Sequence, residues 1–426
     1  MIRSPIAFLA ALALTCSAAL GDRLPLLHAD GTRLVDANGN VVHLKGCNLG
    51  NWFMIEPWML GNCIEARDQF TIFATLRDRF GEDAGNHLID LYRGGYITPR
   101  DFDIIKSFGF NLVRLPFDYR MVQDDTPPYP IRADAFKWLD HAVDMADAAG
   151  VYIILDLHGA PGGQSLEMHT GKAGVNQFYT NPEDQDRLVA IWHALADHFQ
   201  NRSAVAAYDL LNEPYSDHHH DVRPVLKAVM PRVYSAIRQT GDQHVVFFPG
   251  PITGGIQFYG DPHARGWTNI GFTEHTYAGL FGKDKPTIAN HLHMLGEEFA
   301  RRKAYLDRIG VPYYLGEFNV VRDVAGGPAM MRRYYDRAAE FDWSATMWSY
   351  KLIKRRGGMT PDPWFMVTNA HRLPQLDLQT SSYEDFERFF TELSTMDLTV
   401  NEPLRAALTD ATPPALPQEV QDTQPN

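Results

Sequence analysis

Eight apolar, β-branched or aromatic runs recur along the chain, and amphipathic helical patterns separate most of them. The runs show little alternation of polar and apolar residues, which is typical of parallel strands that are covered on both faces. They lie at residues 41–48, 111–117, 151–158, 205–212, 244–249, 269–275, 312–317 and 345–351. Eight such strands alternating with helices predict an α/β fold, a (β/α)8 TIM barrel in a single domain.

Most of the helical patterns end at a glycine, which is a common C-cap signal. They span residues 99–107, 133–149, 183–200, 222–240, 288–309, 329–341 and 383–393. No helical pattern separates the fifth and sixth strands, so residues 251–266 are expected to form a loop. Residues 65–93 predict a helical insertion after the first strand, and residues 354–380 a long loop after the eighth. A doubly wound open sheet is the alternative, but the residues after the first strand lack its glycine-rich fingerprint.

The two ends of the chain differ in composition from the rest. Residues 1–21 combine Arg3, an apolar run and a small-residue stretch, the layout of a secretory signal peptide cut after Ala19 or Gly21. We therefore expect a secreted monomer, extracellular or periplasmic, without a membrane span. Residues 22–408 form the expected barrel domain, which opens with a β-hairpin turning at Asn38-Gly39. The Pro/Gln-rich tail at 409–426 is expected to be disordered.

Charge and cysteine content exclude several classes of protein. The chain carries 39 basic and 52 acidic residues, a net charge of −13, whereas a nucleic-acid binder needs a basic face. Three cysteines are too few for a scaffold built on disulfides. In an oxidising compartment Cys47 and Cys63 are either bridged or two buried thiols, and the sequence leaves both possibilities open.

Polar residues fall repeatedly at the ends of the predicted strands, where a barrel places its catalytic groups. Two of them are glutamates, Glu213 after the fourth strand and Glu317 after the seventh. A pair of carboxyl groups on either side of a glycosidic bond is the usual equipment for its hydrolysis. One carboxyl must donate a proton to the leaving oxygen and the other must be ionised to attack the anomeric carbon.

A set of motifs in fixed order makes the pattern far more specific than any one of them. The motifs are Gly46-Cys-Asn-Leu-Gly-Asn-Trp52, Asn111-Leu-Val-Arg-Leu-Pro116, Leu155-Asp-Leu-His-Gly159, Leu211-Asn-Glu-Pro214, His275-Thr-Tyr277 and Gly316-Glu-Phe-Asn319. With these motifs the chain resembles glycoside hydrolase family 5, within the clan A retaining β-glycosidases, from about residue 44 to residue 351.

The resemblance implies a role for each matching residue. Glu213 is expected to be the general acid/base, its pKa raised by burial and by the charge of Glu317, the nucleophile. Arg114 and a hydrogen bond from Tyr277 are expected to keep Glu317 ionised, and Asn212 to bind the sugar 2-hydroxyl. The resemblance further implies hydroxyl contacts or acid/base tuning by His158 and His275, and a sugar platform at Trp348. With the carboxyls about 5 Å apart, retention of anomeric configuration is expected.

Finer similarities point to one branch of the family. Residues 48–57, 97–102 and 156–164 look like the exo-β-1,3-glucanase and β-1,6-glucanase branch, although Asn51 stands where that branch often has glycine. This resemblance adds Glu56 and Trp52 as substrate-binding residues and a β-glucan polysaccharide or oligosaccharide as substrate. An endo-β-1,4-glucanase or mannanase remains an alternative, and a non-catalytic glycan-binding barrel is an alternative of another class.

No cofactor and no metal are expected. The sequence has no His-Glu-x-x-His and no Gly-x-Ser-x-Gly motif, which disfavours a metal-dependent hydrolase and an esterase. The triplet His218-His219-His220 follows the Asn-Glu-Pro motif, and we interpret it as a solvated loop on the rim of the cleft.

Overall fold

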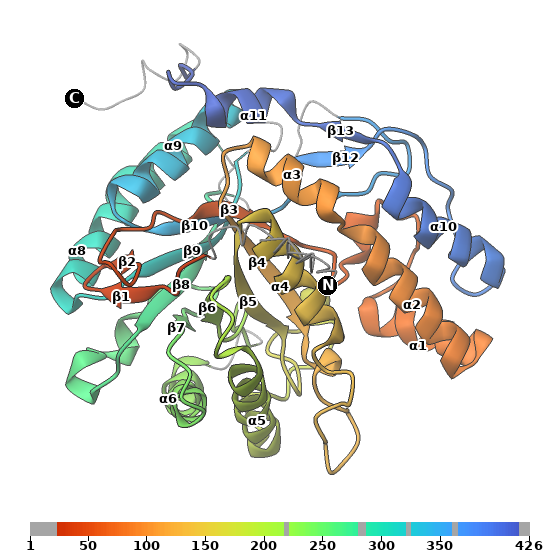
Figure 1. Cartoon of the computed structure of the whole chain (residues 1–426), viewed down its shortest axis with the longest axis horizontal. Helices are drawn as coiled ribbons and strands as arrows, with labels where there is room; N and C mark the ends of the chain where they lie inside the picture. The colour runs from red at the N-terminus through yellow and green to blue at the C-terminus, as the bar shows by residue number, and fades with distance from the viewer. Residues whose placement is uncertain (1–23, 217–220, 280–286, 321–324, 360–364, 417–426) are drawn as a thin grey trace, which may run out of the picture.

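The predicted strands form a closed parallel barrel in which neighbours in the sequence are also neighbours in space (Figure 1). This computed structural model describes residues 24–216, 221–279, 287–320, 325–359 and 365–416. The first and last strands of the barrel pair with each other and close it. All eight predicted strands are confirmed, as β3 (Lys45–Asn48), β4 (Leu112–Asp118), β5 (Tyr152–Gly159), β6 (Val205–Asp209), β7 (Val245–Pro249), β8 (Ile270–Thr276), β9 (Tyr313–Phe318) and β10 (Ser344–Met347).

An outer layer of helices surrounds the barrel (Figure 1). It comprises α3 (Pro99–Ser107), α4 (Lys137–Ala149), α5 (Pro182–Phe199), α6 (Arg223–Gln239), α7 (Ile288–His293), α8 (Phe299–Ile309), α9 (Gly327–Glu340) and α11 (Glu402–Thr409). The helix predicted over 288–309 contains a π-helical turn, η6 (Met294–Glu298), between α7 and α8. Between β7 and β8 the chain forms only the 3-10 turns η4 (Gln257–Tyr259) and η5 (His263–Arg265), close to the predicted loop.

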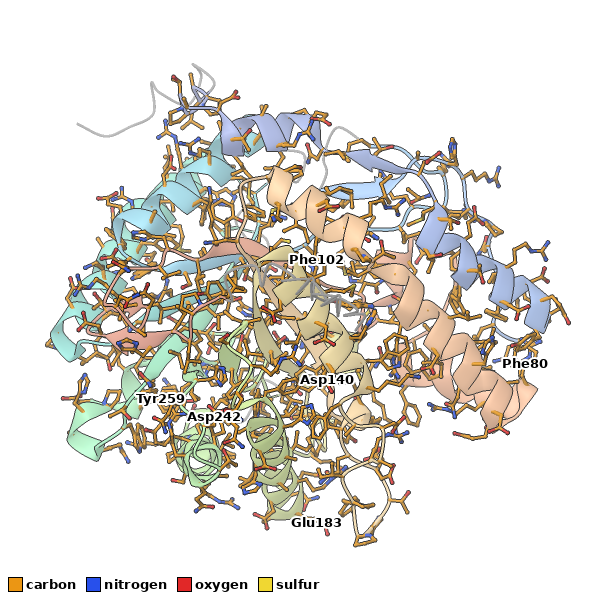
Figure 2. The ribbon with its side chains drawn as sticks, in the orientation of Figure 1. Phe80, Phe102, Asp140, Glu183, Asp242 and Tyr259 are labelled. Atoms are coloured by element: carbon orange, nitrogen blue, oxygen red, sulfur yellow. The ribbon has the colours of Figure 1, made fainter. Side chains whose placement is uncertain are left out.

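The helix α3 shows why these segments fold where they do. Thr98 and Asp101 form a capping box at its start, and Pro99 occupies the first turn, where a missing N–H costs nothing. Phe102 and Ile105, three residues apart on one face, are buried between the helix and its neighbours (Figure 2).

The N-terminal segment contains the predicted turn and another one before it. Strands β1 (His28–Asp30) and β2 (Arg33–Val35) form a hairpin that turns at Gly31. After β2 the chain turns again at residues 36–40, where the Asp36 carboxylate accepts hydrogen bonds from the backbone N–H groups of Asn38 and Asn40 and Val35 pairs antiparallel with Val41. The Asn38-Gly39 turn is therefore found, but the first barrel strand begins at Lys45 instead of Val41.

A second layer of structure packs outside the barrel, between α3 and the C-terminal region (Figure 1). The predicted insertion forms α1 (Gln69–Phe80) and α2 (Glu82–Tyr96), and α10 (Tyr383–Thr395) packs against α2. A three-stranded sheet of β11 (Lys351–Leu352), β12 (Val367–Asn369) and β13 (Leu398–Val400) lies within the region predicted as a long loop and beyond it. Strands of two or three residues are too short to leave a pattern in the sequence.

Cys47 and Cys63 are free, buried thiols in this structure, so the bridged alternative is not the one found. None of the helices described here has the length and apolar character that a membrane crossing requires. The expected signal peptide, the histidines at 218–220 and residues 417–426 of the tail lie outside the described residues.

Candidate active site

Arg114 on β4 lies at the centre of a charged cluster inside the barrel. Its side chain is completely buried, and its guanidinium faces three carboxylates from three other strands. Nε lies 2.9 Å from Asp209 Oδ2, Nη2 lies 3.0 Å from Asp156 Oδ1, and Nη1 lies 2.7 Å from Glu317 Oε1. One cation thus contacts acids from β5, β6 and β9, which lie far apart in the sequence and meet only in the folded barrel.

The same guanidinium orients two asparagine side chains. Nη1 donates to Oδ1 of Asn48 at 3.0 Å, and Nη2 donates to Oδ1 of Asn212 at 2.9 Å. Because its oxygen is taken by Arg114, the Asn212 amide presents its N–H groups elsewhere. That buried nitrogen has no partner among the described residues, so it is a donor available to a ligand.

Glu213 lies four residues beyond the end of β6, in a left-handed backbone conformation with φ of 39°. Such a φ is unfavourable for a side chain with a Cβ and is found preferentially at functional sites. The Glu213 carboxylate is 14% exposed and lies among histidines. Oε1 lies 2.8 Å from Nδ1 of His275, and Oε2 lies 3.9 Å from Nε2 of His169.

Glu317 near the end of β9 faces Glu213. Arg114 donates to its Oε1, and the Tyr277 hydroxyl donates to its Oε2 at 2.7 Å. One ligand atom from each of Glu213, His275 and Glu317 lies within 4.8 Å of the other two. One oxygen of each glutamate therefore lies within 4.8 Å of the other, which is compatible with the separation of about 5–5.5 Å between the carboxyl groups of glycosidases that use one of them as a nucleophile.

Burial dominates the electrostatics of this pair. Loss of hydration raises the pKa of Glu317 to about 7, although His275, Arg114 and the Tyr277 hydrogen bond lower it; the negative charge of Glu213 raises it further. Arg114 and Tyr277 lower the pKa of Glu317, in the expected direction, and desolvation opposes them. Burial lowers the pKa of His275 to about 4, so this ring is neutral at neutral pH.

The other predicted histidine is fixed by a carboxylate. His158 Nδ1 lies 2.6 Å from Asp156 Oδ2, and burial lowers the pKa of this histidine well below its usual value. The His158 ring stacks on Trp348 with 5.7 Å between ring centroids. Trp348 belongs to an apolar cluster with Met59, and Tyr277 packs against this cluster. The structure thus brings together all the residues predicted from the motifs of β4 to β10.

The two residues predicted from the finer similarities behave differently. Glu56 is half-buried near the glutamate pair, and burial raises its pKa to about 8. The hydrogen bond from the Trp58 indole lowers this pKa, whereas the negative charges of Glu317 and Glu213 raise it further. Trp52 instead lies in the core. It is 1% exposed, stacks on Phe53 and donates its N–H to the carbonyl of Arg93 at 2.7 Å. We therefore remove Trp52 from the substrate-binding residues.

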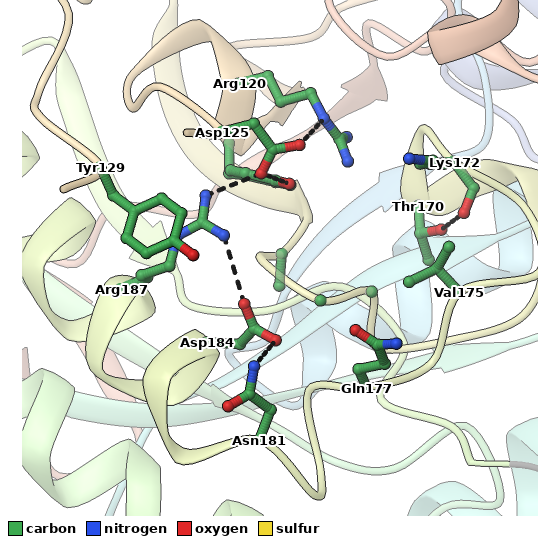
Figure 3. Close-up of a pocket in the computed structure, with 14 residues that line it drawn as sticks. Arg120, Asp125, Tyr129, Thr170, Lys172, Val175, Gln177, Asn181, Asp184 and Arg187 are labelled. Carbon is green, nitrogen blue, oxygen red and sulfur yellow. Dashed lines mark hydrogen bonds and ion pairs between the residues drawn. The ribbon is translucent and has the colours of Figure 1, made fainter. Parts of the chain in front are cut away.

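A polar cavity of about 250 Å³ is lined by residues that follow β4 and β5 in the chain (Figure 3). Arg187 pairs there with Asp184 at 3.3 Å and Asp125 at 3.0 Å, and its guanidinium lies over the Tyr129 ring. Arg187 is thus paired with acids on both sides, and we interpret the cluster as structural. Thr170, on the loop between β5 and α5, lines this cavity, and the residue before it, His169, faces Glu213.

Sequence reasoning quoted Asn48 and Asp156 within motifs but gave them no role, and it missed Asp209 and His169. Asp156 and Asp209 carry a usable signal, because each is an acid within an otherwise apolar strand run. A charge in such a run must find a buried partner, and Arg114 was the available cation. His169 lies in a loop of irregular sequence and left no such signal.

Comparisons with known proteins agree with this geometry. The family model described as cellulase (glycosyl hydrolase family 5) matches residues 83–352. A beta-xylosidase of Phanerodontia chrysosporium is 32% identical over 319 residues, which are 73% of this chain and 63% of that protein. A probable glucan 1,3-beta-glucosidase A of Neosartorya fischeri is 33% identical over 185 residues, 42% of each chain. The matches thus span less than two thirds of the length of these curated relatives.

Solved structures agree on the architecture. The crystal structure of an endogalactoceramidase has a TM-score of 0.57 and 20% sequence identity, covering 76% of this chain and 75% of the other. At this identity the likeness shows the barrel fold alone.

Proposed function

The chain belongs to glycosyl hydrolase family 5, and we propose that it is a retaining β-glycosidase working by double displacement between Glu213 and Glu317. One observation carries the proposal. The two carboxyl groups have oxygens within 4.8 Å of each other, yet each has its own partners, His275 for Glu213 and Arg114 with Tyr277 for Glu317. Different partners let two identical side chains take different roles.

In the first step Glu317 attacks the anomeric carbon while the glycosidic C–O bond breaks. The departing oxygen takes the proton from Glu213, and a glycosyl ester of Glu317 forms. Arg114 and Tyr277 hold the attacking carboxylate in place and stabilise its charge before the bond forms. The free Asn212 N–H donor is placed to bind a sugar hydroxyl, a contact that strengthens in the transition state.

In the second step water attacks the same anomeric carbon. Glu213, now a carboxylate, takes a proton from the water as the new C–O bond forms, and the ester bond to Glu317 breaks. Glu213 is protonated again and Glu317 is free, so the cycle closes. Two inversions give net retention of the anomeric configuration.

For the substrate we propose a β-glucan with β-1,3 or β-1,6 linkages, attacked from the chain end by an exported enzyme. The similarity to a probable glucan 1,3-beta-glucosidase A supports the glucose unit. The half-buried Glu56 supports exo action, because a carboxyl near the glutamate pair can bind the hydroxyls of a terminal sugar. Trp348, stacked on His158, supplies an apolar ring under the bound sugar.

A β-xyloside is the second candidate substrate. The beta-xylosidase of Phanerodontia chrysosporium matches 73% of this chain, much more than the glucanase match covers. Glucose differs from xylose by one hydroxymethyl group, which a pocket discriminates by about 1–3 kcal/mol. The choice between them is therefore a question of rates.

Proton NMR of the first product formed from an aryl β-glycoside tests the mechanism. We expect the β-anomer to appear first and to mutarotate later. The variant Glu317→Gln should still fold and should lose activity by at least about a thousandfold, because no covalent ester can form. An α-anomer as first product would contradict double displacement.

A substrate panel tests the specificity. Laminarin, pustulan, cello-oligosaccharides, mannan and xylo-oligosaccharides should be compared under the same conditions, with aryl β-glucoside and β-xyloside giving the ratio of kcat/KM. Release of single glucose units from laminarin or pustulan is the expected result. Oligosaccharides of several lengths from cellulose or mannan would instead favour an endo-acting enzyme. Retention on glycan gels without any hydrolysis would favour a binding protein.

A further inference from the structure

Next to the glutamate pair lies a histidine for which the double-displacement chemistry has no assigned role. His169 follows Met168 in the short 3-10 turn η3 (Met168–Thr170), on the loop between β5 and α5. Its Nε2 atom is buried and has no hydrogen-bond partner among the described residues. The same atom lies 3.9 Å from Oε2 of Glu213.

The geometry around Glu213 separates its two oxygens. His275 Nδ1 contacts Oε1, which leaves Oε2 as the oxygen that exchanges a proton with the reacting groups. A separation of 3.9 Å is too long for a direct hydrogen bond between Oε2 and His169. It does suit one bridging oxygen atom, which can lie about 2.8 Å from both ends.

We propose that His169 is a positioning residue whose Nε2–H holds, together with Glu213 Oε2, first the departing glycosidic oxygen and then the attacking water. The proposal rests on the proposed retaining mechanism and adds a second anchor on the leaving-group side.

In bond breaking, the departing oxygen receives the proton of Glu213 and accepts a hydrogen bond from His169 Nε2–H. In the second step the water donates one O–H to the Glu213 carboxylate and accepts the hydrogen bond from His169 with one lone pair. The other lone pair of the water oxygen then attacks the anomeric carbon. His169 remains a neutral donor in both steps and gives up no proton. Burial lowers the pKa of His169 to about 4, which agrees with a neutral ring.

The loop is built to keep this ring in place. The backbone N–H of Phe70 donates to the carbonyl of Gly171 at 2.9 Å, and that of Ala173 donates to Asp68 Oδ2 at 2.9 Å. The His169 ring also packs edge-on against His158, with 6.0 Å between ring centroids. A side chain fixed from two sides, with an unused polar atom toward the acid/base, matches a positioning role.

Leaving-group dependence separates this role from a merely structural one. In His169→Phe, kcat/KM on an oligosaccharide, whose leaving oxygen needs a proton, should fall at least about tenfold, the effect of one lost hydrogen bond. On the 2,4-dinitrophenyl glycoside, whose leaving group needs no proton, kcat/KM of the variant should stay within about threefold of the wild-type value. Its kcat should fall, because the addition of water in the second step becomes slow. His169→Gln, which retains an N–H donor, should recover part of the loss.

The matched control is His291→Phe. His291 on α7 is also buried with an Nε2 atom that lacks a partner among the described residues, but it contacts Tyr334 instead of the site. We expect both substrates to react normally in this control. Equal losses on both substrates in His169→Phe, or none, would overturn the role of His169 while leaving the mechanism intact. A wild-type protein inactive on every β-glycoside would overturn the proposed function and this inference with it.

Discussion

At the residue scale, Arg114 is the side chain on which the site depends most. Arg114 contacts Asp156, Asp209 and Glu317. Burial raises the pKa of each of the two aspartates to about 7, although the positive charge of Arg114 lowers it. Without the guanidinium these groups would remain buried without a cation, which is costly however they titrate.

We therefore expect Arg114→Met to lose about 3–5 kcal/mol of unfolding free energy, the cost of breaking a buried ion pair by removing one partner. Urea unfolding followed by tryptophan fluorescence measures this loss. Arg388→Met is a control, because the Arg388 side chain is 72% exposed and pairs with Asp385. A variant at position 114 as stable as this control would contradict the central role of Arg114.

Tyr277 offers a test of the pKa of Glu317. A protonated nucleophile cannot attack, so kcat/KM should fall as the pH drops through about 7, the raised pKa of Glu317 in the free enzyme. The Tyr277 hydroxyl lowers this pKa by donating to the carboxylate. Tyr277→Phe should therefore shift the acidic limb of the pH profile to higher pH. An acidic limb that stays in place or moves to lower pH would show that the hydroxyl does not act on Glu317.

Glu56 links titration to stability. Its folded-state pKa of about 8 lies above the ordinary value of 4.5, so folded Glu56 keeps its proton when the unfolded chain has lost it. The resulting stability is complete at low pH and is lost as the pH rises through about 8. Glu56→Gln should match the wild-type melting temperature at pH 4 and exceed it increasingly up to pH 8. A constant difference across this range would mean that Glu56 titrates normally.

The sequence predicted the reacting pair because Glu213 and Glu317 stand at strand ends inside motifs. It could not predict the raised pKa of Glu317, since burial depends on side chains from the whole barrel. It also misplaced Trp52, because an aromatic ring near a strand end has the same pattern whether it faces the cleft or the core.

At the scale of elements, periodicity located every barrel strand, but local hydrogen bonds set the boundaries. The first barrel strand begins at Lys45, after the turn held by Asp36, and the fourth predicted strand ends at Asp209, three residues before Asn212. This early end matters, because it allows Glu213 to adopt its left-handed backbone.

The loop between β5 and α5 gives an element-scale prediction. Gly171 has φ of 82°, and a Cβ there would lie 2.1 Å from Oδ2 of Asp118. Gly171→Ala should displace η3 and with it His169, lowering kcat/KM on oligosaccharides by about tenfold or more. Gly150→Ala is a matched control, since its φ is also positive but a Cβ would contact nothing within 4 Å. Equal activity in the two variants would show that the position of this loop does not affect catalysis.

At the scale of the whole molecule, the barrel is a packed core closed at one end and reactive at the other. Leu27, which precedes β1, and Leu34 in β2 pack with Leu44, Leu112 and further residues near the starts of the barrel strands. The polar cluster of Arg114 lies toward the opposite ends. A barrel requires side chains from every strand to fill its interior, so the hairpin acts as a plug.

This division predicts that stability and activity can be changed separately. Leu34→Ala removes a side chain that is 3% exposed and leaves a cavity at the closed end, which should cost about 2–5 kcal/mol of unfolding free energy. Below the melting transition kcat/KM should stay unchanged, because the glutamate pair and Arg114 keep their contacts at the other end. Denaturant unfolding and steady-state kinetics on the same preparation measure both quantities. A loss of kcat/KM in fully folded Leu34→Ala would mean that the closed end also determines the geometry of the carboxyl pair.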